Sequence, residues 1–145
     1  MKLSASEEYG LRCLVRLARH EREGFGEPLG IPRIAVDEGM SEPNTAKILR
    51  QLRQAGLVRA FRGAQGGYRL AHDPATLTLR AILSGLDGPG ILQQPCSTPA
   101  GCVHVRDCTL RGLWRELDDT MAGLLERVTL ADLLEDPGHL QEATP

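Results

Sequence analysis

A change of hydrophobic periodicity after Gly56 constrains the fold of this 145-residue chain more than any other feature. Residues 57–62 alternate apolar and basic side chains, residues 63–67 are rich in glycine, and residues 68–71 resume the alternation. Alternation predicts β-strands, and glycine permits the positive φ angles that a tight connection between strands needs. The segment is therefore predicted to form a β-hairpin.

The sequence before the hairpin shows helical spacing of its apolar residues instead. A first amphipathic helix is expected from residue 4 to about residue 20. Pro32 suits the first turn of a short second helix that Gly39 ends, and Ser41 is a good N-cap for a third helix that runs to Gly56. Two short helices joined by a tight turn form a helix-turn-helix, and the hairpin makes it a winged helix-turn-helix.

A short helix is expected over residues 77–83, and a long amphipathic helix follows nearer the C-terminus. Its apolar stripe runs from Leu110 to Val128 and spans about 30 Å at 1.5 Å per residue. Such a stripe is too long and too apolar for a small winged domain to cover. We expect this helix to dimerise, with packing against its own domain as the alternative. Its apolar stripe consists of Leu110, Leu113, Trp114, Leu117, Met121, Leu124, Leu125 and Val128.

The predicted fold class is mainly α with a small β-hairpin, in which a winged helix-turn-helix precedes a long C-terminal dimerisation helix. The expected divisions are a DNA-binding domain over residues 1–88, a cysteine loop over 89–108, the dimerisation helix over 109–136 and a polar tail over 137–145.

Charge is segregated along the chain, although its net value is only −2. Between Pro43 and His72 there is no acid, and there are six basic residues: Lys47, Arg50, Arg53, Arg59, Arg62 and Arg69. Such a block predicts binding to double-stranded DNA, with a merely solvated basic face as the alternative.

The third helix and the hairpin supply the candidate DNA contacts. In a winged helix-turn-helix, the second helix of the motif enters the major groove and the wing touches backbone or minor groove. The first turn of that helix would present Pro43, Asn44 and Lys47 to the DNA bases. Asn can pair with adenine and Lys with guanine, so these side chains are candidates for reading the sequence. Phosphate contacts are expected from Arg50 and Arg62, and Gln65 lies with Arg62 at the tip of the wing.

Three cysteines stand at two equal gaps of five residues, in a stretch with the composition of a loop: Cys96, Cys102 and Cys108. Without a secretory signal, clustered thiols indicate a metal or redox site, and an iron–sulfur cluster or tetrahedral zinc would need a fourth ligand. A thiol–disulfide switch is the other possibility. The fourth cysteine, Cys13, lies in an apolar helical run and is expected to pack in the core.

Other classes of function are not expected. The N-terminus carries acids where a signal peptide needs an apolar core, and no apolar run is long enough to span a bilayer, so we expect a cytoplasmic protein without membrane contact. No nucleophile, base and orienting group occur as a set, so an enzyme is not expected. A small iron–sulfur carrier that binds a protein is a further alternative, against which the acid-free basic block counts.

The order of these parts resembles the Rrf2 family, whose cluster-binding members include the IscR-type and NsrR-type regulators. The resemblance covers about residues 1–135 and implies a homodimeric DNA-binding transcription factor that senses redox, nitric oxide or iron status. It implies an iron–sulfur cluster, of the 4Fe–4S or 2Fe–2S type, on Cys96, Cys102 and Cys108. The matching segments are Met1-Lys2-Leu3-Ser4, residues 52–58, Arg62-Gly63-Ala64-Gln65-Gly66-Gly67-Tyr68-Arg69-Leu70 and Thr129-Leu130-Ala131-Asp132-Leu133.

Two departures from that family affect the predicted sites. Arg111 stands where IscR-type members have a cluster-binding histidine, and a guanidinium offers no usable lone pair. NsrR-type members instead can use a carboxylate from the partner's first helix, which makes Glu8 the candidate fourth ligand and His104 its rival. The third helix begins Ser41-Glu42-Pro43-Asn44-Thr45 where members often have Ser-x-x-Tyr-Leu, so the operator sequence stays open.

Overall fold

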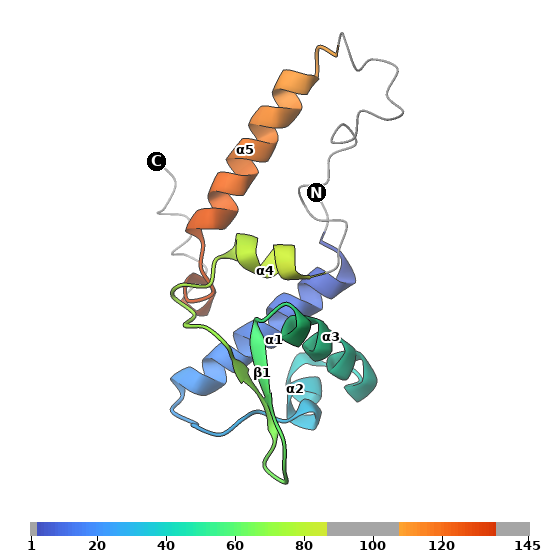
Figure 1. Ribbon diagram of the computed structural model, residues 1–145, viewed down its shortest axis with the longest axis vertical. Coiled ribbons are helices and arrows are strands. Elements are labelled where there is room, and N and C mark those ends of the chain that lie inside the picture. Colours follow the sequence, from blue (N-terminus) through green and yellow to red (C-terminus); the bar gives the residue numbers. More distant parts are fainter. Residues whose placement is uncertain (1–2, 87–107, 136–145) are drawn as a thin grey trace.

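The computed structural model describes residues 3–86 and 108–135. Its described part is mainly helical with one antiparallel hairpin, as the sequence predicted, and α5 projects from the body formed by the other elements (Figure 1). The predicted ligands Cys96, Cys102 and His104 and the predicted tail 137–145 lie outside the described residues. The elements are α1 (Ala5–Arg22), α2 (Ile31–Glu38), α3 (Glu42–Gln54), β1 (Val58–Phe61), β2 (Gly67–Leu70), α4 (Leu79–Gly85), α5 (Arg111–Arg127) and the 3-10 turn η1 (Asp132–Leu134).

Local signals in the sequence set the ends of the first three helices. The Ser4 hydroxyl accepts a hydrogen bond from the Glu7 backbone N–H at 3.2 Å, and the Glu7 carboxylate accepts one from the Ser4 N–H at 2.7 Å. This reciprocal capping box fixes the start of α1. Gly39 ends α2 with a left-handed φ of 64°, and the Ser41 side chain caps α3, so both predictions are confirmed.

The hairpin pairs β1 with β2 in an antiparallel register that runs from Val58 opposite Leu70 to Phe61 opposite Gly67. Gly63 has a φ of 112°, a backbone conformation that favours glycine. Leu29 adds an isolated bridge to Tyr68, with two backbone hydrogen bonds of 3.0 and 2.9 Å. The segment between α1 and α2 therefore contributes a short extension to the sheet.

The core lies between α1, α3 and the hairpin, and it includes Leu17, Leu49 and Leu70. Cys13 is fully buried there, as expected, and burial raises the pKa of its thiol to about 12, with a smaller contribution from the nearby Glu38 carboxylate. A thiol in this state is protonated at neutral pH and behaves as a small apolar side chain.

The expected helix over 77–83 begins later than predicted, at Leu79. The reason is that Thr78 caps the helix, accepting a hydrogen bond from the Ala81 N–H at 3.2 Å, and also forms an isolated bridge with Thr129. Leu77 and Leu130 are buried beside that bridge and joined by a 2.8 Å backbone hydrogen bond. This pairing holds the C-terminal end of α5 against the body.

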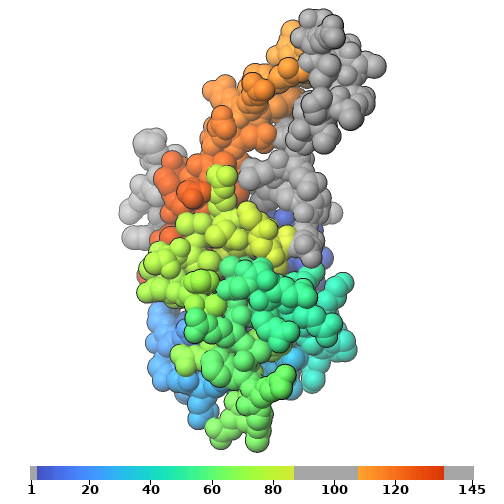
Figure 2. All heavy atoms as spheres, viewed as in Figure 1, coloured from blue at the N-terminus to red at the C-terminus, as the bar shows by residue number. Residues whose placement is uncertain are grey.

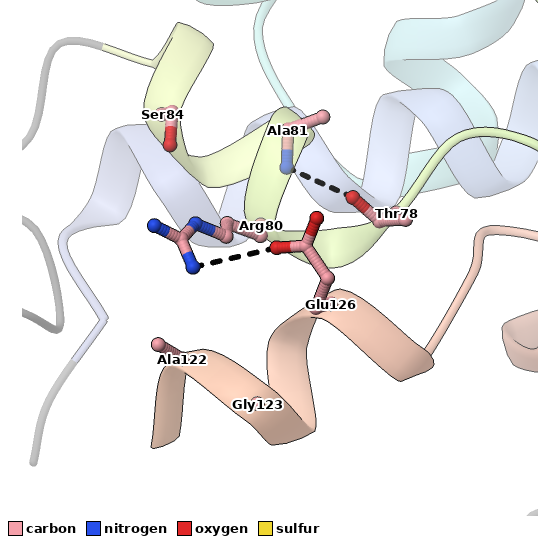
Figure 3. Close-up of a pocket in the computed structure, with 7 residues that line it drawn as sticks. All are labelled: Thr78, Arg80, Ala81, Ser84, Ala122, Gly123 and Glu126. Atoms are coloured by element: carbon pink, nitrogen blue, oxygen red, sulfur yellow. Dashed lines mark hydrogen bonds and ion pairs between the residues drawn. The ribbon is translucent and has the colours of Figure 1, made fainter. Parts of the chain in front are cut away.

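Helices α4 and α5 face each other across a shallow groove of about 580 Å³ (Figure 3). Small side chains line most of it, and Arg80 on α4 forms a 3.4 Å ion pair with Glu126 on α5. No helix within residues 3–86 and 108–135 is both long enough and apolar enough to cross a membrane.

Candidate nucleic-acid interface and sensor residues

Helix α3 has one buried face and one exposed face. Thr45 is buried, and its hydroxyl donates to the Ser41 carbonyl at 3.0 Å. The Thr45 side of the first helical turn therefore faces the body of the protein. Pro43, Lys47 and Arg50, at spacings of four and three, share the exposed face. The structure thus brings three of the predicted DNA-contacting residues together on one surface.

Asn44 lies at the edge of this surface and is half buried. Its backbone N–H donates to the Ser41 hydroxyl at 3.4 Å, and its side-chain amide lies 4.0 Å from the Met40 sulfur. A thioether is a weak acceptor, so the amide can leave it for a stronger partner at little cost. Asn44 is therefore held in place by its backbone, and its side chain has donor capacity to spare.

The wing carries Arg62 and Gln65 at its exposed tip. Gly66 has no room for a side chain, because a Cβ there would lie 2.5 Å from the Phe61 carbonyl oxygen. Figure 2 shows the wing, in light green, and α5, in orange, protruding from opposite ends of the molecule. Helix α5 and the tip of the wing are thus well separated in space.

The six basic residues between Pro43 and His72 divide into two kinds. Arg69 lies 3.6 Å from the Glu21 carboxylate and donates to the Gly26 carbonyl at 3.1 Å. Within the described part of the chain, the other five have no acid partner, and all five are exposed: Lys47, Arg50, Arg53, Arg59 and Arg62. Their positive charge therefore faces solvent without local compensation, as an anion-binding surface requires.

Ion pairs between α1 and α2 hold the first helix of the motif in place. Arg16 donates to the Asp37 carboxylate at 2.6 Å, and Arg12 pairs with Glu38 at 3.0 Å. Within α2, Arg33 approaches the same Asp37 carboxylate at 2.9 Å. The hydrogen bond from Arg16 is the main cause that holds the pKa of Asp37 below its usual value. Sequence reasoning missed these pairs, although the i,i+4 spacing of Arg33 and Asp37 was a signal for one of them.

The predicted sensor residues are only partly described. Cys108 is half buried just before α5, and its carbonyl accepts a 3.4 Å hydrogen bond from the Arg111 backbone N–H. Glu8 is exposed in the first turn of α1, whereas its neighbour Glu7 is buried in the capping box. No three metal-binding side chains come together within residues 3–86 and 108–135. The three-cysteine site stays a prediction, because Cys96 and Cys102 lie outside those residues.

Known proteins resemble this chain in sequence and architecture. The family model described as Rrf2, iron-dependent transcriptional regulator, matches residues 3–136. The chain is 33% identical over 143 residues to the HTH-type transcriptional regulator CymR of Bacillus subtilis (strain 168), covering 99% of this chain and 96% of that protein. It is 29% identical over 136 residues to the HTH-type transcriptional regulator IscR of Serratia proteamaculans (strain 568), covering 94% and 80% respectively.

A solved structure of CymR from B. subtilis, described as the global cysteine regulator, matches with a TM-score of 0.73 and 31% identity. The match covers 92% of this chain and 96% of that one, so the shared fold includes nearly the whole chain. The relatives are regulators of transcription and not enzymes. The chain therefore belongs to the Rrf2 family of transcriptional regulators.

Proposed function

We propose that the protein is a homodimeric DNA-binding regulator whose operator affinity depends on an iron–sulfur cluster held by its loop cysteines. The observation that carries the DNA-binding part is the exposed basic surface on α3 and the wing, whose five cations have no acid partner among the described residues. Counterion release from DNA favours such uncompensated cations.

On the DNA, α3 would lie in the major groove. Its exposed face would bring Pro43 and Lys47, with Asn44 at its edge, to the base edges. Arg50 and, on the wing, Arg62 would meet phosphates. Gln65 accompanies Arg62 at the wing tip. Base contacts specify the sequence and phosphate contacts fix the orientation, so the two groups of residues differ in what their loss would change.

The second subunit would pack along α5. Leu110, Leu113, Leu117 and Leu124 are 53%, 51%, 48% and 46% exposed on this helix, although they form the apolar stripe that the sequence predicted. An apolar stripe of this kind marks a protein interface. A second copy with two-fold symmetry would cover it and would present two α3 helices to paired half-sites.

The residues fit an iron–sulfur cluster by the chemistry of their donors. Thiolates are the usual ligands of such clusters, and Cys96, Cys102 and Cys108 supply three. The exposed Glu8 carboxylate has no ion pair with any described residue and would supply the fourth ligand from the partner subunit. When bound, the cluster would supply chemistry that responds to redox state, nitric oxide or iron supply.

A thiol switch is the second candidate. The 33% identity to CymR, a relative whose solved structure is described as the global cysteine regulator, favours it. Cys108 is half buried and so remains partly accessible to an oxidant or a second thiol. In this reading the same three cysteines change covalent state without a metal.

Anaerobic purification separates these possibilities. Visible absorption, iron and sulfide analysis, and native mass spectrometry of the same sample would distinguish a cluster, zinc and bare thiols. We expect the visible absorption bands that are typical of iron–sulfur proteins. We also expect iron and sulfide in equal amounts per subunit. Zinc, or a mass that corresponds to the chain alone, would contradict the cluster.

A further inference from the structure

A side-chain hydrogen bond joins the first turn of α1 to α3. The Ser6 hydroxyl donates to the Gln51 side-chain oxygen at 3.0 Å, between residues 45 positions apart in the chain, and both side chains are half buried. Gln51 lies one helical turn after Lys47 and adjacent to Arg50. A displacement of the α1 turn would therefore act directly on the helix that carries the candidate DNA contacts.

The same part of α1 also carries a residue proposed for the sensor. Glu8, two positions after Ser6, carries the proposed carboxylate ligand. Gly10 faces Leu86, the last described residue before the cysteine-containing segment, so closely that a Cβ on Gly10 would lie 2.7 Å from the Leu86 Cδ1 atom. The proposed ligand Glu8, the close approach to Leu86 and the hydrogen bond to α3 thus all start from one short stretch of helix.

This stretch has the rigidity to move as a unit. The capping box between Ser4 and Glu7 fixes its first turn, and Glu7 is 1% exposed. A change in the pull on Glu8 would therefore be transmitted to Ser6 rather than absorbed by fraying of the helix end.

We infer that the Ser6–Gln51 hydrogen bond couples the state of the cysteine sensor to the position of α3, with Gln51 as a positioning residue that touches no DNA itself. The inference rests on the proposed function. A hydrogen bond that is equally good in both sensor states contributes nothing to a difference between them. The bond must therefore be stronger in one state, and the free energy of one neutral hydrogen bond corresponds to a change of about three- to tenfold in affinity.

The test compares operator affinities of the cluster-loaded and cluster-free full-length protein, for wild type, Ser6→Ala, Gln51→Met and the double variant. The probe is a duplex that the wild type selects from a random-sequence library, and visible absorption checks cluster content. Each single variant should reduce the ratio of the two affinities about three- to tenfold. The double variant should show no further reduction, because both changes remove one bond.

Gln54→Met is the matched control, because Gln54 is an exposed residue of α3 for which the described residues show no side-chain hydrogen bond. Its affinity ratio should equal that of the wild type. If Ser6→Ala and Gln51→Met both keep the wild-type ratio, the inference is overturned while the proposed function stands. If the wild type itself binds equally in both states, the proposed sensor function fails and the inference fails with it.

Discussion

Arg59 and Arg69 lie directly opposite each other in the hairpin, yet only Arg69 has an acid partner among the described residues, the Glu21 carboxylate at 3.6 Å. Two like charges in this register destabilise a hairpin unless something compensates them. The Glu21 carboxylate also accepts a 2.9 Å hydrogen bond from the Leu70 backbone N–H. One acid from α1 therefore both anchors β2 and leaves Arg59 as the uncompensated member of the pair.

The wing is expected to contribute phosphate contacts. With Arg50 and Arg62 from each subunit on phosphates, the logarithm of operator affinity should fall with the logarithm of salt concentration with a slope of about −4. Arg62→Ala should reduce that slope by about 2 per dimer and weaken binding to all sequences alike. Fluorescence anisotropy over a salt series measures both effects.

Arg19→Ala is the control for the wing, because Arg19 is an exposed arginine on α1 and belongs to neither α3 nor the hairpin. Its slope should match that of the wild type. A slope in Arg62→Ala that is no different from that of Arg19→Ala would exclude a phosphate contact by the wing.

The apolar stripe of α5 is expected to hold the dimer together. Leu117→Lys places a charge in the middle of the proposed interface and removes a leucine whose burial is worth about 2 kcal/mol per subunit. Multi-angle light scattering should show a dimer for the wild type and a monomer or aggregate for the variant. Asp119→Asn, which makes the same change in net charge about 200° around the helix, should remain a dimer. A monomeric wild type would contradict the proposed dimer and, with it, the binding to paired half-sites.

Replacing single cysteines should separate the sensor from the core. Cys108→Ser removes one of three thiolates and should bleach the anaerobically purified protein or leave its cluster labile. Cys13→Ser should keep full iron and sulfide content and instead lose about 1–3 kcal/mol of stability, because it buries a hydroxyl in the apolar core. Metal analysis and thermal unfolding of both variants measure this contrast. Full iron and sulfide content in Cys108→Ser would exclude it as a ligand.

Asp37 should stabilise the helix-turn-helix in a way that depends on pH. Its pKa is lowered in the folded protein, mainly by the hydrogen bond from Arg16, so its contribution is present above the unfolded value of 3.8 and is lost as the pH falls through the folded value. Asp37→Asn should cost up to about 1 kcal/mol near pH 7, the range of exposed ion pairs. Urea unfolding at pH 7 and pH 3 should show a smaller difference from wild type at the lower pH. An equal difference at both would mean that the carboxylate charge is not the cause.

The sequence predicted those parts of the fold that local signals determine. Ser41 and Gly39 define the turn between α2 and α3 through a cap and a left-handed residue, and both signals act within a few positions. The bridges of Leu29 to Tyr68 and of Thr78 to Thr129 could not be predicted, because each involves one residue pair and leaves no periodic pattern. The same holds for the Ser6–Gln51 hydrogen bond.

The candidate site divides in the same way. The spacing that buries Ile48 and Leu52 also exposes Lys47 and Arg50, so helical periodicity was sufficient to place them. The pairing of Arg69 with Glu21 depends on how α1 crosses the hairpin, which the sequence alone does not reveal. The pattern Ser4-x-x-Glu7 was a signal for the buried capping box that our sequence analysis left unused.

The central claim is that the state of the cysteine site controls DNA binding. Its most direct test is the operator affinity of one anaerobic preparation before and after chelation removes the cluster, with duplexes selected separately by the loaded and the cluster-free protein. The account predicts an affinity difference of at least about tenfold, within the range of allosteric coupling. Equal affinities in the two states, on both duplexes, would contradict it.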